Sequence, residues 1–240
     1  MNKMIIDIDD QKSVKAAMDR ISENWFNPND MYSSLKTNGQ INSSEFWGVA
    51  THLLADISGF LGLTSAQFVS EWNQRCIRYD AKVMGYHCTR QCNKQVFAEK
   101  GILPLSEETI KLSRDTNQTP QANSMWEYRS QRSPGPWFLL SYKYAKSPDN
   151  HFCLKGAEIL LACNGHQIGV DSATSMPLIV YCAIPYSILS EKDYVAFCIL
   201  RAHFNYIDPE DDLTNLFESY SIDLRGKILD PQYIVGIEEL

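Results

Sequence analysis

The chain has 240 residues, of which 44% are hydrophobic, 11% aromatic and 21% charged. This is the composition of a globular protein, and it excludes disorder, collagen and coiled coil as the main organisation. Its 22 Lys and Arg residues against 29 Asp and Glu residues give a net charge of -7, so the chain lacks the basic surface of a general nucleic-acid coat.

Neither the amino terminus nor any later segment carries the apolar run of a secretory signal or a membrane-spanning helix. The seven cysteines are an odd number and are scattered among apolar residues, where cysteine behaves as a small hydrophobic side chain. We therefore expect a reduced, cytoplasmic protein without a membrane partner.

The first 80 residues carry apolar residues at the three-and-four spacing of helical faces. A helix over residues 43–57 is predicted to end at Gly59 and Gly62, and another to begin at Thr64, where Gln67 completes a capping-box pattern. Together with an earlier, weaker helix, their predicted apolar faces comprise Val14, Ala17, Met18, Ile21, Phe46, Trp47, Ala50, Leu53, Leu54, Ile57, Phe68, Val69, Trp72 and Cys76. Residues 1–80 are thus predicted to form a helical N-terminal region.

From Ala81 onward, short apolar runs rich in β-branched and aromatic residues are separated by polar loops. One helix is predicted from about Gln91 to Lys100, ending at Gly101, and another begins at Ser106. The predicted strands are Val83–Thr89, Trp137–Tyr142, Glu158–Cys163, Leu178–Ile184, Tyr194–Leu200 and Tyr233–Ile237. Strands without regularly alternating helices indicate an α+β fold with a largely antiparallel sheet over residues 81–240.

The most informative stretch reads VMGYHCTR and covers residues 83–90. Side chains alternate along a strand, so Gly85, His87 and Thr89 share one face. Tyr86 and Cys88 then point the other way, towards a core. A glycine beside two hydrogen-bonding side chains suits a backbone that a ligand approaches closely. The alternative is a satisfied polar pair at a sheet edge.

His87-x-Thr89 resembles the first core strand of the ADP-ribosyltransferase fold, in the branch whose active-site signature is His-Tyr-Glu. The turn GILPL at 101–105, the aromatic run 137–144 (WFLLSYKY) and the segment 155–160 (KGAEIL) come next in an order similar to that family. The stretches 177–185 and 231–236 also look like its core strands. The resemblance covers roughly residues 81–240 and implies a catalytic core built on a split antiparallel sheet.

The resemblance implies that NAD is the substrate and that its nicotinamide–ribose bond is cleaved. Nicotinamide is positively charged in NAD and departs neutral, so no general acid is needed. The energetic cost is the oxocarbenium-like charge on the ribose, which one carboxylate can stabilise. By resemblance this carboxylate is Glu158; Gln167, Glu191 and Glu238 are fallback positions for the catalytic residue.

The resemblance also implies which residues hold NAD and where the ADP-ribose goes after cleavage. Tyr142 or Tyr144 would stack on the nicotinamide. The residues implied to bind NAD and orient its reactive bond are Gly85, His87, Thr89 and Arg90. ADP-ribose would then pass to a macromolecular acceptor, protein or nucleic acid. Intracellular members of such families are often bacterial toxins, which implies a neutralising antitoxin docked on the helical first third.

Cysteine and histidine residues offer other chemistries. A zinc site would draw on His87, Cys88 and Cys92, or on Cys163 with His166, but these residues lack the regular paired spacing of zinc ligands. A cysteine hydrolase would pair Cys88 with His151, His166 or His203, although no strained nucleophile turn surrounds them. We therefore predict no metal and favour buried thiols.

Two further function classes stand beside the transferase. The long polar segment 114–136 mixes aromatic and basic residues around Trp126–Arg129 and Arg132, a mixture that can stack on and neutralise single-stranded nucleic acid. A nucleic-acid-processing enzyme is therefore one alternative. The other is a non-catalytic α+β binding module in which His87 and Glu158 are structural.

Overall fold

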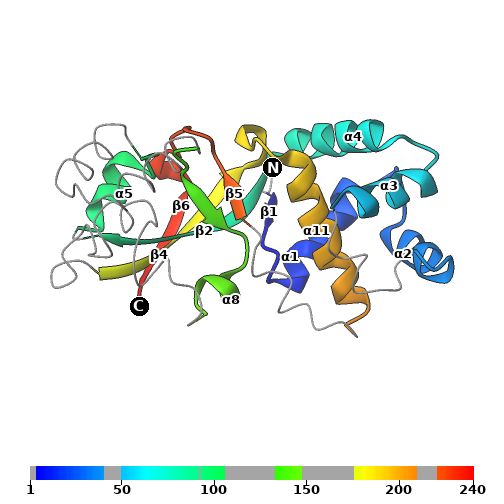
Figure 1. Ribbon diagram of the computed structural model, residues 1–240, viewed down its shortest axis with the longest axis horizontal. Coiled ribbons are helices and arrows are strands. Elements are labelled where there is room, and N and C mark those ends of the chain that lie inside the picture. Colours follow the sequence, from blue (N-terminus) through cyan, green and yellow to red (C-terminus); the bar gives the residue numbers. More distant parts are fainter. Residues whose placement is uncertain (1–3, 41–49, 92, 106–132, 148–175, 210–220) are drawn as a thin grey trace, which may run out of the picture. The chain divides into compact units, whose positions relative to one another are not determined.

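The computed structural model describes residues 4–40, 50–91, 93–105, 133–147, 176–209 and 221–240 (Figure 1). The predicted strand Glu158–Cys163, the predicted helix at Ser106 and most of the polar segment 114–136 lie outside these ranges. The described residues form N-terminal helices and a six-stranded mixed sheet, so the predicted α+β class is confirmed.

The chain divides into two compact units, one formed by Met1–Val83 with Pro185–Tyr220 and the other by Met84–Ile184 with Ser221–Leu240. This division differs from the predicted boundary after residue 80, because a later segment returns to the helical unit. The helical unit is therefore made of two stretches of chain that are far apart in the sequence.

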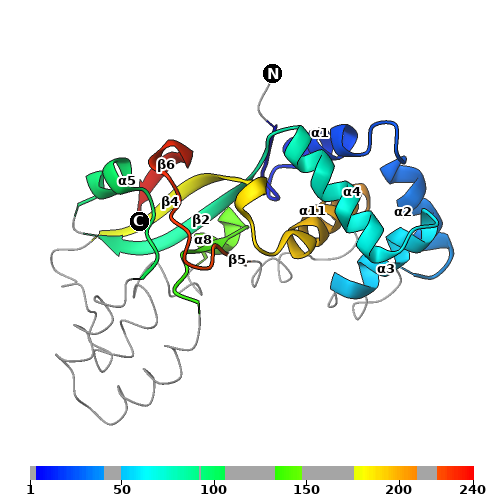
Figure 2. The same cartoon turned by 90° about the horizontal axis from the view of Figure 1, so that it is seen from above.

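The helical unit is built around α11 (Lys192–Ile207), which packs against α1 (Gln11–Ile21), α3 (Ala50–Phe60) and α4 (Ser65–Arg78) (Figures 1 and 2). Helix α2 (Pro28–Thr37) packs against α3. Strand β1 (Met4–Ile6) pairs in parallel with the first residues of β2 (Ala81–Gln91). Burial of the predicted faces of α1, α3 and α4 is confirmed at Val14, Ala17, Met18, Ile21, Leu53, Leu54, Ile57, Phe68, Trp72 and Cys76.

Helix α4 begins as predicted. The Thr64 side chain accepts from the Gln67 backbone N–H at 3.2 Å, and the Gln67 side chain accepts from the Thr64 backbone N–H at 2.9 Å. Two of the donors left open at the helix start are thereby satisfied.

The strand predicted over Tyr194–Leu200 is wrong, since these residues lie inside α11. Every residue from Val195 to Phe204 is buried, and those from Val195 to Leu200 are all apolar. A fully buried helix has no polar face to impose a period of 3.6 on the sequence, and a short apolar run then reads equally well as a buried strand.

His203 of α11 is 6% exposed, and its Nε2 has no hydrogen-bond partner among the described residues. Burial lowers its pKa to about 4; the negative charge of Asp19 raises the pKa and the positive charge of Lys15 lowers it, both by less than burial does. The unfolded chain takes up this proton near pH 6.5, whereas the folded chain does so only near pH 4. Lowering the pH through this window therefore favours the unfolded state.

We expect the free energy of unfolding to fall by up to about 3 kcal/mol between pH 6.5 and pH 4 because of His203. Urea unfolding followed by circular dichroism at a series of pH values measures this. The variant His203→Gln keeps a polar side chain without the titration, so its stability should depend less on pH between 6.5 and 5, where most carboxylates stay ionised. Equal slopes for the two proteins would contradict the assignment.

The second unit contains the rest of the sheet, whose strand order is β5-β3-β2-β4-β6. These strands are β3 (Trp137–Leu139), β4 (Met176–Pro185), β5 (Ser221–Asp223) and β6 (Ile234–Glu239), with the longer β2 and β4 as neighbours in Figures 1 and 2. Strand β6 runs antiparallel to β4, and β3 runs antiparallel to both β2 and β5. The predicted strands 83–89, 178–184 and 233–237 are confirmed as β2, β4 and β6, with ends that differ by one or two residues.

The predicted strand Trp137–Tyr142 is correct only in its first half. It ends at Leu139, and α8 (Tyr142–Ala145) begins after Ser141, whose hydroxyl accepts from the Tyr144 backbone N–H at 3.2 Å. A serine N-cap satisfies a donor of the first helical turn, which is a local reason for the change from strand to helix. Tyr142 and Tyr144 therefore lie on a helix.

The predicted helix that ends at Gly101 is present as α5 (Gln95–Lys100) and begins four residues later than expected. Gly101 adopts φ 72°, a backbone conformation that favours glycine. Beyond it, Ile102 and Leu229 exchange two backbone hydrogen bonds, and the short 3-10 helix η4 (Pro231–Tyr233) leads into β6. The bridge thus fixes the chain just before η4, and β6 then pairs with β4.

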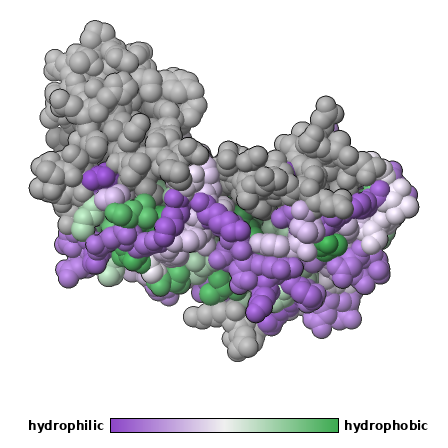
Figure 3. Space-filling view, turned by 90° about the horizontal axis from the view of Figure 1, so that it is seen from below, coloured by the Kyte–Doolittle hydropathy of each residue, from purple (hydrophilic) through white to green (hydrophobic). Residues whose placement is uncertain are grey.

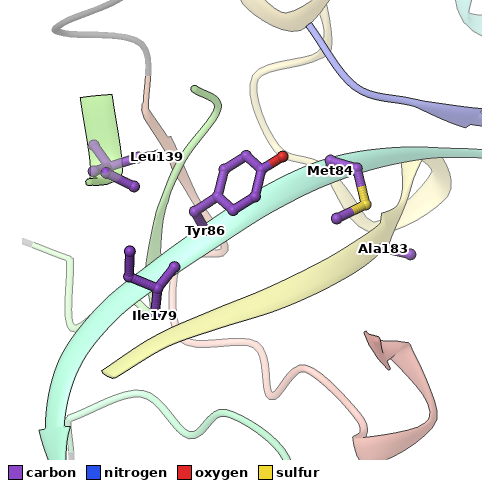
Figure 4. Packing of buried hydrophobic residues seen from close by; sticks show 6 residues of the cluster. Met84, Tyr86, Leu139, Ile179 and Ala183 are labelled. Carbon is purple, nitrogen blue, oxygen red and sulfur yellow. The ribbon is translucent and has the colours of Figure 1, made fainter. Parts of the chain in front are cut away.

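A hydrophobic cluster packs on one face of β2 and β4. Figure 4 shows Met84 and Tyr86 of β2 together with Ile179 and Ala183 of β4 and Leu139. Cys88, Tyr142, Tyr144 and Tyr181 pack against these residues and are partly buried.

On the face shown in Figure 3, the hydrophobic residues that the structure describes do not form one continuous area. They form separate patches among hydrophilic ones. Single exposed apolar side chains are normal on protein surfaces. Among the described residues no single helix is long and apolar enough to span a membrane; α3 and α4 pass that test only as a pair bent by 87°.

Candidate functional site

The predicted alternation along β2 is confirmed. Tyr86 is 2% exposed and lies in the hydrophobic cluster, with Cys88 packed against it. His87 lies on the opposite face, where its ring centroid is 5.6 Å from that of Phe138. The residues of β2 thus contribute to two separate surfaces of the sheet.

The His87 imidazole is held by a backbone group of the neighbouring strand. Its Nδ1 lies 2.9 Å from the Trp137 carbonyl oxygen, which can only accept, so Nδ1 carries the proton. Burial lowers the pKa of His87, although this hydrogen bond acts in the other direction. At neutral pH the ring is therefore uncharged, and Nε2 is an acceptor.

Gly85 lies where side chains of its own unit come close to the backbone. A Cβ atom at this position would be 2.6 Å from Ile184 Cδ1 and 3.0 Å from Phe138 Cβ. The close approach that the sequence assigned to a ligand is thus made by these two side chains. Farther along β2, the Thr89 hydroxyl lies 3.5 Å from the Arg90 carbonyl oxygen, at the limit of a hydrogen bond.

The face of the sheet that carries Tyr86 also carries a polar group of side chains, Tyr142, Lys146, Tyr181 and Glu238, which we call the tyrosine–carboxylate cluster. The Tyr142 hydroxyl donates to Glu238 Oε2 at 2.9 Å, and the Tyr181 hydroxyl donates to the same oxygen. Lys146 Nζ donates to Glu238 Oε1 at 2.7 Å. Both carboxylate oxygens are therefore engaged.

Three elements position this cluster. Glu238 of β6 pairs with Ile179 of β4, and Tyr181 follows Ile179 by two residues, which places both on one face of the sheet. Tyr142 begins α8 and Lys146 is its C-cap, so one helical turn brings them together.

The aromatic rings beside the carboxylate contact one another. The ring centroids of Tyr86, Tyr142 and Tyr181 are 5.4 to 5.5 Å apart in all three pairs, with tilted or edge-on planes. Tyr86 is buried beneath, whereas Tyr142 and Tyr181 are only partly buried. The rings form a rigid aromatic support next to a negative charge.

These hydrogen bonds shift the pKa values of the ionisable groups in the cluster. The hydrogen bond from Lys146, followed by that from Tyr181, lowers the pKa of Glu238. Burial and the hydrogen bond to Glu238 raise the pKa of Tyr181, and the hydrogen bonds to Glu238 and Tyr142 raise the pKa of Lys146. At neutral pH Glu238 is therefore a carboxylate, Tyr181 keeps its hydroxyl proton and Lys146 is an ammonium. The Glu238 side chain is 26% exposed, so an ionised carboxylate is within reach of solvent.

The structure brings together some of the residues that the sequence suggested. Tyr142 and Glu238 are in direct contact, while Tyr144 packs against the hydrophobic cluster. Glu191 is the N-cap residue of α11 in the helical unit. Glu158 and Gln167 lie outside the described residues.

Two members of the cluster were not predicted. Tyr181 lies within a correctly predicted strand, and its period-two relation to Ile179 and Ala183 was the available signal. Lys146 follows Tyr142 by four residues, a signal that has meaning only on a helix, and Tyr142 was predicted to end a strand.

Some of the cysteines and candidate zinc ligands lie among the residues that the structure describes. Among the described residues, no group of three or more His, Cys, Asp and Glu side chains could hold a metal ion. His87 and Cys88 lie on opposite faces of β2, while Cys92, His151, Cys163 and His166 lie outside the described ranges. Burial raises the pKa of the thiols of Cys76, Cys182 and Cys198, which makes them poor nucleophiles.

The resemblance to the ADP-ribosyltransferase fold rests on short motifs in the sequence. Comparison of the chain with protein-family models, with curated proteins and with solved structures found no match.

Proposed function

We propose that the chain binds NAD, cleaves its nicotinamide–ribose bond and passes ADP-ribose to a macromolecular acceptor, protein or nucleic acid. The observation that carries the proposal is the ionised, solvent-accessible carboxylate of Glu238, which Tyr142 and Tyr181 hold in a fixed position. In this proposal Glu238 takes the role that the family resemblance suggested for Glu158.

The chemistry needs a negative charge where the ribose becomes cationic. A carboxylate with a lowered pKa stays ionised at neutral pH, and its tyrosine partners keep it from turning away as charge develops. Because the carboxylate is oriented before the reaction, little energy is lost in reorganising it. Nicotinamide leaves as a neutral molecule, so no proton donor is required at the leaving group.

The aromatic rings supply a surface for the leaving group. Tyr142 is partly buried, and its hydroxyl contacts Glu238, so a nicotinamide stacked on this ring lies near the carboxylate. The mutual contacts with Tyr86 and Tyr181 keep the ring from rotating. Orientation of the reactive bond in this way contributes to rate through proximity.

The His-x-Thr motif lies on the other face of β2, which affects the roles of the predicted NAD-binding residues. A single nicotinamide riboside can contact only one of these two faces of the sheet, the face with His87 or the face with Tyr142. We assign the reaction to the Tyr142 face, with His87 serving to hold β2 against β3 through the Trp137 carbonyl. The NAD-binding role first expected of Gly85 is likewise replaced by its packing against Ile184.

A second candidate is a binding module without catalysis. It is favoured by the contacts of Glu238, since both of its oxygens already accept hydrogen bonds and one of the donors carries a positive charge. A neutralised carboxylate stabilises an oxocarbenium ion less well. Such a module would bind its ligand and leave it intact.

The deciding experiment incubates the whole protein with NAD alone, with protein acceptors and with nucleic-acid acceptors, and measures nicotinamide release and labelled products. We expect nicotinamide release in at least one condition, and a labelled acceptor where transfer occurs. A rise in melting temperature at saturating NAD without nicotinamide release would favour the binding module. No release and no thermal shift would refute the proposal.

A further inference from the structure

We propose that the tyrosine–carboxylate cluster is a binding site for a positively charged pyridinium ring and that the Lys146 ammonium occupies this site when no ligand is bound. The inference rests on the proposed function, because the nicotinamide ring of NAD is such a cation. It adds that the chain carries its own competitor for the site.

The Lys146 ammonium has the contacts that a bound cation requires. Its Nζ donates to Glu238 Oε1 at 2.7 Å and to the Tyr142 hydroxyl at 3.1 Å. The same atom is 5.6 Å from the centroid of the Tyr142 ring, so it lies beyond the hydroxyl and not over the face of the ring. A carboxylate and a phenol oxygen thus converge on a single positive charge, and the carboxylate would also attract a charge of another origin.

Lys146 is also easily displaced. Its side chain is 52% exposed, and the ammonium is carried by a flexible aliphatic chain. Exposed ion pairs of this kind contribute little to stability. When Lys146 turns into solvent, the hydroxyls of Tyr142 and Tyr181 still hold Glu238 in place. The carboxylate then regains its uncompensated charge without a rearrangement of the sheet.

A pyridinium ring suits this site better than an ammonium does. Its charge is spread over a flat ring, which is more weakly hydrated than a compact ammonium and can stack on Tyr142. A ligand that replaces Lys146 therefore exchanges a weak surface pair for a stacked, charge-paired contact. Neutral nicotinamide offers the same ring without the charge.

The test uses 1-methylnicotinamide as the cationic probe and nicotinamide as its neutral counterpart, with affinities measured by calorimetry on the full chain. We expect the wild-type protein to bind 1-methylnicotinamide more tightly than nicotinamide. The variant Lys146→Met removes the ammonium and keeps most of the unbranched side chain, so it should bind the cation about two- to fivefold more tightly. Glu238→Gln should bind it at least about tenfold more weakly.

Lys143→Met is the matched control, since it removes one positive charge from the same helix. A similar gain in affinity for this variant would show a general charge effect and overturn the inference. Equal affinity for the two probes, or weaker cation binding by Lys146→Met, would also overturn it.

The binding test of this inference can succeed or fail independently of the NAD cleavage test of the proposed function. Cation preference without NAD cleavage supports this site and removes the catalytic role. NAD cleavage without a preference for the cationic probe would support the proposed enzyme activity and refute the role of Lys146.

Discussion

Replacement of Glu238 by glutamine is expected to lower the rate of NAD cleavage by about 100- to 1,000-fold, the usual cost of removing one preorganised electrostatic contact to a transition state. Glutamine keeps the shape of the side chain and can still accept from Tyr142, so the fold should be retained. Only the negative charge that faces the developing ribose cation is lost. The measurement is nicotinamide release under saturating NAD, with circular dichroism to verify folding.

The neighbouring residue provides a matched control. Glu239 is also in β6, its side chain is 46% exposed, and it pairs with Lys94 at 2.5 Å away from the cluster. We expect Glu239→Gln to keep the rate within about twofold, since exposed ion pairs contribute little. If the two variants lost activity equally, the effect would come from the overall charge of β6 and not from a catalytic carboxylate.

A second comparison separates Glu238 from the residue that the family resemblance suggested. Under our proposal Glu158→Gln retains most of the cleavage activity. Full loss with Glu158→Gln and full activity with Glu238→Gln would return the catalytic role to Glu158, and the tyrosine–carboxylate cluster would then be a structural feature of the sheet. Loss in both variants would show that each carboxylate is needed.

Local features of this fold could be predicted from the sequence because each depends on a few neighbouring residues. Thr64 and Gln67 mark the start of α4 through side chains that bond to nearby backbone groups. Along β2, a period of two separates Tyr86 from His87 onto opposite faces. Helix α5 ends at Gly101, because the chain adopts a positive φ there that glycine tolerates better than other residues.

Features that depend on tertiary environment could not be predicted in the same way. The stretch Val195–Leu200 of α11 is buried and wholly apolar, so it has no polar positions that would have revealed the helical period. The contact between Tyr142 and Glu238 joins residues 96 positions apart, so only the sheet topology brings them together. Glu238 was one of several suggested carboxylates, and nothing in its local sequence distinguished it from the others.

Gly101→Ala is expected to lower the stability of the sheet unit by at least about 3 kcal/mol, the combined effect of backbone strain and overpacking. Gly101 has φ 72° and ψ -153°, a conformation that alanine avoids. A Cβ atom there would lie 1.9 Å from the Leu229 carbonyl oxygen and 3.1 Å from Pro231 Cδ. Because backbone atoms cannot turn aside like a flexible side chain, the Ile102–Leu229 bridge must shift or break.

Gly59→Ala is the control, because a Cβ atom at Gly59 in α3 meets no atom within 4 Å. That variant should be neutral or more stable by up to about 1 kcal/mol, as alanine favours a helix over glycine. Urea unfolding measures both changes. Pro231–Tyr233 connects the bridge to β6, so Gly101→Ala should also reduce NAD cleavage by displacing Glu238, whereas Gly59→Ala should not. Unchanged stability of Gly101→Ala would contradict the expected clash with Leu229, and unchanged NAD cleavage would mean that the bridge does not hold β6 in place.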